Sequence, residues 1–208
     1  MKTIIFNTES DKDYINYAAE KLKNGAIGIF PTDTVYGIGC NAFDENAIKK
    51  LFKLKLRDYS KPINVLISDK KMLDLLVDNV SEKEQKLIDA FWPGALTIIF
   101  NKKNTIPDLL TSNLNTIGVR MPNNQTCLNL LNSTGTPIAT TSANISNEVP
   151  GIKISDFYNT FNNKVDFILD SGISDIKIAS TIVQIVDNVP YILREGSITK
   201  KQIEEALS

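Results

Sequence analysis

The sequence predicts an α/β fold in which a twisted, mixed sheet is flanked by helices. Short β-rich runs alternate along the chain with amphipathic segments of helical period, as in α/β domains. Several β-rich runs also follow one another with no helix between them, which favours a mixed over an all-parallel sheet. The chain has 208 residues, 42% of them hydrophobic, close to the common size of one domain. We therefore expect a single domain over residues 1–208.

Elements in the first part of the chain are predicted from periodicity and from residues that begin or end helices. Gly25 is a suitable stop for the first helix, because glycine adopts left-handed backbone conformations without steric cost. Asp44 is a suitable N-cap for the second helix, which is expected to run into residues 55–61. The predicted order is a strand over 3–6, a helix over about 11–24, a strand over 26–30, the helix after Asp44 and a strand over 63–67.

The rest of the chain continues the alternation. Ser81 and Glu84 form a capping-box pattern, and Trp92-Pro93-Gly94 ends the helix that follows it. The Asn-rich stretches 101–104 and 144–147 are expected to be loops. Helices are predicted over 72–77, 82–91, 126–131, 155–161 and 199–207, and strands over 95–100, 116–120, 137–140, 167–170, 180–186 and 191–193.

Composition excludes several classes of function. The 23 basic and 24 acidic residues nearly cancel, so any anion site must be local. There is no histidine, and Cys40 and Cys127 lie far apart, which excludes histidine triads and the common zinc sites. Each cysteine is expected to be a small buried apolar residue. The N-terminal residues do not resemble a secretion signal, and no apolar run reaches about 18 residues, so we expect a cytoplasmic protein with no membrane partner.

Three segments carry candidate chemistry, and each also has a purely structural explanation. Residues 31–39 place hydroxyls, a carboxylate and a phenol directly after a strand, where open α/β folds bind ligands, but could equally form a capped turn. Cations gather near residues 53–61, either as a solvated helix end or as a polyphosphate clamp. Residues 137–146 lead from an apolar strand into hydroxyls and amides, which would suit a nucleotide, an amino acid or a plain polar loop.

Three smaller signals lie further along. Arg120 leaves an apolar strand and therefore needs a partner, for which a surface carboxylate would serve as well as a substrate. Ser180-Thr181 and the segment 193–196 are weak evidence by themselves.

Taken together and in order, these segments resemble the YrdC-type threonylcarbamoyl-AMP synthase family, over nearly the whole chain. The family pairs a K-x-R motif, here Lys55 and Arg57, with an S-x-N motif, here Ser142 and Asn144. The matching blocks are PTDTVYGIGCNA, KLKLRDYSKPINVLI, WPGALTIIF, TIGVRMPN, PIATTSANISN, STIV and ILREG.

The resemblance implies a YrdC-like fold with a positively lined concave face and a defined reaction. Such proteins join L-threonine, bicarbonate and ATP into threonylcarbamoyl-adenylate and pyrophosphate, for modification of a tRNA adenosine by a separate tRNA threonylcarbamoyl transferase. We expect Mg²⁺ to accompany ATP, held mostly by phosphate and water, with no metal site built from protein side chains. The anionic reactants call for charge neutralisation and alignment rather than a strong base.

The resemblance also implies roles for particular residues. Arg120 is expected to face the carboxylate of threonine, and Leu66 stands where family members often have histidine. The residues implied for catalysis are Lys55, Arg57 and Lys61; for ATP binding, Arg57, Lys61, Thr116, Ser142, Asn144, Pro150 and Arg194; and for threonine binding, Thr34, Leu66, Arg120, Thr140 and Ser180.

Two other readings remain open at this level. An RNA-binding module of the same fold would use the basic concavity without turnover, although the balanced charge and the lack of clustered aromatic residues disfavour more than weak RNA binding. A carbamoyl-handling domain of hydrogenase-maturation proteins is similar, but those chains are much longer, whereas this one resembles the short, single-domain form of the synthases.

Overall fold

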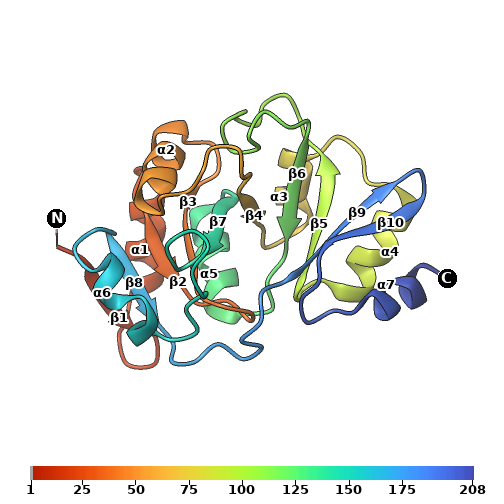
Figure 1. Cartoon of the computed structure of the whole chain (residues 1–208). Helices are drawn as coiled ribbons and strands as arrows, with labels where there is room; N and C mark the ends of the chain where they lie inside the picture. Colours follow the sequence, from red (N-terminus) through yellow and green to blue (C-terminus); the bar gives the residue numbers. More distant parts are fainter. Residues whose placement is uncertain (1) are drawn as a thin grey trace.

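A computed structural model describes residues 2–208. Its ten strands form one mixed sheet in the order β1-β8-β2-β3-β7-β4-β6-β5-β9-β10. Figure 1 shows the sheet running between the two chain ends, with helices packed along it. The strands are β1 Ile4–Asn7, β2 Gly28–Phe30, β3 Gly37–Asn41, β4 Asn64–Leu66, β5 Leu96–Asn101, β6 Thr116–Arg120, β7 Ile138–Ser142, β8 Phe167–Asp170, β9 Thr181–Val186 and β10 Val189–Arg194.

Parallel and antiparallel pairs are interleaved across the sheet. The parallel pairs are β1 with β8, β2 with β8, β4 with β6 and β5 with β9. The antiparallel pairs are β2 with β3, β3 with β7, β4 with β7, β5 with β6 and β9 with β10. The prediction of a mixed sheet is therefore confirmed.

The helices follow the predicted caps closely. The Asp44 carboxylate accepts hydrogen bonds from the backbone N–H groups of Asn46 and Ala47, and the capping box of Ser81 and Glu84 is formed. The helices are α1 Tyr14–Lys23, α2 Glu45–Leu54, α3 Lys70–Leu76, α4 Glu82–Phe91, α5 Gln125–Thr134, α6 Tyr158–Phe161 and α7 Lys200–Leu207, with a 3-10 turn over Ile154–Asp156.

Three predictions of secondary structure were wrong in detail. No strand was predicted over residues 37–41, whereas Gly37–Asn41 is a strand at the centre of the sheet, which excludes the alternative of a single turn over 31–39. A Cβ atom on Gly39 would lie 2.5 Å from the carbonyl oxygen of Ala139, so glycine is needed here for the two strands to approach closely. Because glycine has a low β-propensity, the sequence did not predict a strand at this position. Helix α2 ends at Leu54, just before Leu56 adopts a φ of 51°, and the helix expected over 155–161 is split into two short pieces.

The core extends along the whole sheet and includes both cysteines. Cys40 and Cys127 are fully buried, and burial raises the pKa of each thiol to about 12, so neither is ionised near neutral pH. Within residues 2–208, no helix is both long enough and apolar enough to span a membrane.

Candidate active site

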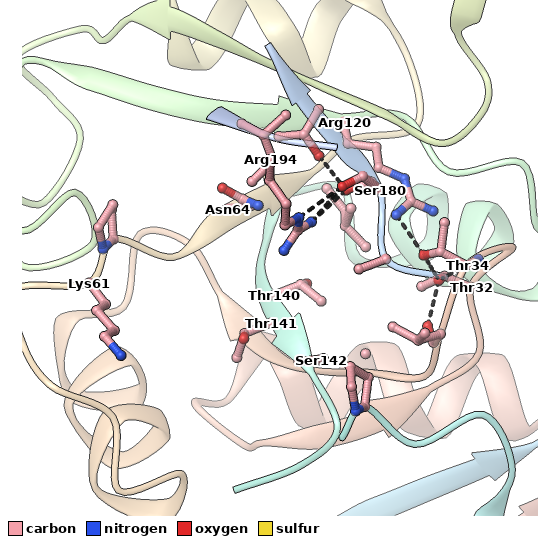
Figure 2. A pocket seen from close by; sticks show the side chains of 18 of the residues that line it. Thr32, Thr34, Lys61, Asn64, Arg120, Thr140, Thr141, Ser142, Ser180 and Arg194 are labelled. Atoms are coloured by element: carbon pink, nitrogen blue, oxygen red, sulfur yellow. Dashed lines mark hydrogen bonds between the residues drawn. The ribbon is translucent and has the colours of Figure 1, made fainter. Parts of the chain in front are cut away.

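A cavity of about 770 Å³ opens over the middle of the sheet. Its walls come from the segment after β2, the segment that leads into β4, strands β5 to β7, and the two ends of the β9–β10 hairpin. Most of the residues implied by the family resemblance line it: Thr34, Arg57, Lys61, Leu66, Arg120, Thr140, Ser142, Pro150, Ser180 and Arg194. The fold thus gathers side chains that are up to 160 positions apart in sequence (Figure 2).

Arg120 lies at one end of the cavity, where each nitrogen of its guanidinium group has a hydrogen-bond partner. Its Nε donates to the carbonyl oxygen of Gly94 at 3.0 Å, and one terminal nitrogen donates to the Thr34 hydroxyl at 2.8 Å. The other terminal nitrogen forms a buried ion pair with Asp33. The partner that an arginine at this strand end requires is therefore a buried carboxylate, neither a surface carboxylate nor a substrate alone. Arginine has five N–H donors, so N–H groups remain to face a ligand.

Arg194 and Ser180 lie between this end and the other cations. The Arg194 guanidinium donates twice to the backbone carbonyl of Ser180, at 2.7 and 3.0 Å, and once to its hydroxyl at 3.1 Å. The Ser180 hydroxyl is also 2.8 Å from that of Thr97, a buried residue of β5. These contacts fix the β9 end of the cavity and present one face of the guanidinium to it.

Arg57 and Lys61 approach the cavity from the segment between α2 and β4. Arg57 donates to the carbonyl oxygens of Lys61 and Pro62, at 3.0 and 2.7 Å. Lys61 donates to the side-chain oxygen of Asn147 at 2.9 Å. Each of these cations is satisfied by neutral acceptors, and no ion pair involving them occurs among the described residues.

The charges lining the cavity are all positive. Arg57, Lys61, Arg120 and Arg194 line it, whereas no aspartate or glutamate among the described residues does so. Burial, and then the charge of a neighbouring arginine, lowers the pKa of Arg57 and of Arg194, which shows that the guanidinium groups repel one another. An anion in the cavity would relieve this repulsion, and the cavity is a local cluster of cations of the kind that the balanced composition requires for any anion site.

Lys55 is not among the residues that line the cavity. The residue is 1% exposed, and its ammonium group donates to the carbonyl oxygens of Ser142 and Asn144 and, at 3.0 Å, to the side-chain oxygen of Asn144. All three N–H donors are thereby used by the loop after β7, and the Ser142 hydroxyl adds a 2.7 Å bond to Asn144. Lys55 and Asn144 thus hold the end of β7, where Ser142 lies, and the loop after it, and the roles implied for them toward substrate stay predictions.

Thr116, the remaining ATP-binding residue of the prediction, does not line the cavity. It lies four positions before Arg120 on β6, so both side chains point to the same face of the sheet. The Asn64 side chain lies over Gly118, which is between them on that face. A ligand would have to extend past Asn64 to reach Thr116, and its role stays a prediction.

Several lining residues had no role in the sequence interpretation. They are Thr32, Ser60, Asn64, Thr97 and Thr141, together with Asp33 directly behind Arg120. Thr32 and Thr141 lie inside motifs that the sequence indicated, and alternation along strands identifies residues that share a face. The sequence could not identify Thr97 as a site residue, because threonine is common in β-strands for structural reasons alone. Leu66 is 4% exposed and lines the cavity where a histidine was the family expectation.

The fold and the cavity together define a class of protein: an α/β protein with a cation-lined site for an anionic ligand over the centre of its sheet. A family model named Sua5_yciO_yrdC, described as telomere recombination, matches residues 20–196. The chain belongs to this Sua5/YciO/YrdC family.

Individual relatives agree with this membership. The chain is 34% identical over 207 residues to the threonylcarbamoyl-AMP synthase of Pyrococcus abyssi, covering 99% of this chain and 61% of the relative. It is 34% identical to a putative threonylcarbamoyl-AMP synthase of Methanocaldococcus jannaschii, covering 95% and 93%. The crystal structure of P. abyssi Sua5 complexed with L-threonine matches with a TM-score of 0.94 and 33% identity, over 100% of this chain and 61% of that one. The chain thus spans about three fifths of the Pyrococcus protein and nearly all of the Methanocaldococcus protein.

Proposed function

We propose that the chain is an L-threonylcarbamoyladenylate synthase, a nucleotidyltransferase that condenses L-threonine, bicarbonate and ATP and releases pyrophosphate. The observation that carries this proposal is a cavity lined by four cations and no carboxylate, in a protein whose net charge is only −1. The names of the relatives and the threonine bound to P. abyssi Sua5 support the amino-acid substrate.

The cavity offers two ends for two substrates. Arg57, Lys61 and Arg194 would neutralise the triphosphate, because arginine provides paired donors for phosphate oxygens and lysine a mobile point charge. Arg120 and Thr34 would hold threonine at the other end through its carboxylate. Ser142 and Pro150, on the wall formed by β7 and the loop after it, would contact the nucleotide.

The reaction then needs alignment more than proton transfer. The amine of threonine and bicarbonate give N-carboxythreonine and water. A carbamate oxygen attacks the α-phosphorus of ATP, and the bond to the β-phosphate breaks as pyrophosphate leaves. Both reactants are anionic, so fixed cations lower their repulsion, and holding them in line contributes roughly 7–11 kcal/mol in well-oriented systems.

Magnesium would enter with ATP as part of the substrate. Residues 2–208 contain no cluster of acidic, cysteine or histidine side chains that could hold a metal ion, and the cavity offers hydroxyls and amides instead. This fits a Mg²⁺ ion coordinated by phosphate oxygens and water.

The product has chemistry that calls for a partner. A carbamic–phosphoric mixed anhydride is readily hydrolysed, so we propose that a separate tRNA threonylcarbamoyl transferase consumes it. An RNA-binding module without turnover is the alternative, and the synthase names of relatives at 34% identity favour the enzyme.

The test is a two-product assay. Purified protein is incubated with MgATP, labelled bicarbonate and L-threonine, and both pyrophosphate and labelled adenylate are followed. Formation of both products only with threonine supports the synthase, whereas ATP binding without either product removes it and leaves RNA binding to be measured. Arg57→Ala is the inactive control, and Lys86→Ala on the exposed face of α4 is the matched control for loss of one positive charge.

A further inference from the structure

The two ends of the cavity differ in how their positive charges are balanced, which bears on substrate selection if the proposed function holds. At one end Arg120 forms an ion pair with Asp33, and the two residues are only 5% and 4% exposed. Arg120 is held in addition by Thr34 and by the carbonyl oxygen of Gly94. This end therefore carries a cation whose charge is already offset.

The opposite end has no such offset. Arg57, Lys61 and Arg194 donate only to carbonyl, amide and hydroxyl oxygens, and none forms an ion pair among the described residues. In Figure 2, Lys61 lies on the opposite side of the cavity from Arg120 and Thr34, and Arg194 lies between them. The positive charges without an ion-pair partner thus begin at Arg194, between the two ends, and extend to Lys61 on the far side.

Asp33 pairs with Arg120 but does not itself line the cavity. Its second carboxylate oxygen is buried without a hydrogen-bond partner. The Cys127 thiol lies near the charges of both Arg120 and Asp33, but it is neutral because burial raises its pKa to about 12. Asp33 is therefore the group that cancels the charge of Arg120 from behind.

We infer that Asp33 is a specificity determinant that makes the Arg120 end accept an amino-acid zwitterion and refuse phosphate groups. A zwitterion has no net charge, so a charge-neutral ion pair can bind its carboxylate through the spare N–H groups of Arg120. A phosphate with two negative charges would instead meet the Asp33 carboxylate a few ångströms behind the guanidinium. ATP and the released pyrophosphate are then confined to the three unpaired cations, and the threonine end stays open for its own substrate.

The experiment measures binding of L-threonine by calorimetry in the absence of ATP, with and without inorganic phosphate, at ionic strength matched with sodium chloride. In the wild type, phosphate is expected to change threonine affinity less than twofold while weakening ATP binding. In Asp33→Asn, a saturating concentration of phosphate is expected to weaken threonine binding at least about tenfold, because a unit charge near Arg120 is lost. Asp33→Glu retains the charge and is expected to keep threonine insensitive to phosphate, even if its affinity is lower.

Two results overturn the inference: displacement of threonine from the wild type by phosphate, or a folded Asp33→Asn variant that remains indifferent to it. Loss of a buried countercharge can unfold a protein, and in that case the wild-type titration still decides. The turnover assay provides a second measurement, in which phosphate is expected to compete with ATP and not with threonine. A merely structural Asp33 would change stability without creating new competition. Failure of the proposed function would appear separately, as absence of threonine-dependent pyrophosphate.

Discussion

Replacement of Lys55 by methionine tests whether this buried cation positions the loop after β7. Methionine has a similar length but no donors, so the carbonyl oxygens of Ser142 and Asn144 and the Asn144 amide oxygen lose their shared partner. A buried acceptor left unsatisfied costs about 1–3 kcal/mol, and removal of a desolvated charge offsets part of the total. We expect a loss of about 2–4 kcal/mol in the free energy of unfolding, or roughly 5–15 °C in Tm for a domain of this size.

The assay combines urea unfolding with turnover. Because Lys55 binds the end of β7, where Ser142 lines the cavity, KM for ATP is expected to rise at least about fivefold, with a smaller change in KM for threonine. Lys49→Met, on the exposed side of α2, is the matched control and should change neither quantity by more than experimental error. A Lys55→Met variant that keeps wild-type stability and wild-type KM for ATP would refute the supporting role.

The difference in the free energy of unfolding between wild type and Lys55→Met is expected to increase with pH. Burial, and then the nearby charge of Arg57, lowers the pKa of Lys55 from 10.5 to about 7. Between these two values the unfolded chain binds a proton that the folded chain has released, so the stability contribution of Lys55 rises with pH. The stability difference between wild type and Lys55→Met should therefore grow between pH 7 and 9, as measured by urea unfolding at both values. A difference that does not grow over this interval would show that Lys55 keeps its proton in the folded chain.

The remaining predictions concern the cavity and the central strand. Arg57→Ala and Lys61→Ala should each reduce kcat/KM for ATP by at least about tenfold with unchanged urea midpoints, and full turnover in either variant would remove that residue from the site. Arg120→Gln should raise KM for threonine far more than KM for ATP, and equal effects would contradict the division of the cavity into two ends. Gly39→Ala should cost about 1–3 kcal/mol in the free energy of unfolding, because the new methyl group meets the carbonyl oxygen of Ala139 across two central strands, and an unchanged urea midpoint would contradict this packing.

Features that depend on local chemistry could be predicted from the amino-acid sequence. Asp44, Ser81 and Glu84 cap helices as predicted, because capping depends on a side chain and on backbone groups two or three residues away. The β6 and β8 bounds matched as well, since both strands are short runs rich in apolar and β-branched residues. Linked motifs along the chain were also sufficient for the family, because their order and spacing are read directly from the residues.

Contacts between residues that are far apart in sequence could be identified only from the folded structure. Gly37–Asn41 became a central strand because neighbouring strands fit closely against its glycines, a packing effect that overrides weak propensity. The Lys55 side chain is held by contacts with Ser142 and Asn144, almost ninety positions away in sequence, and local sequence does not predict such contacts. Asp33 pairs with Arg120, which is 87 positions away in sequence. The other cations of the cavity have no such counterion among the described residues. Charge balance within a cavity depends on such long-range pairs, and local sequence carries no record of them.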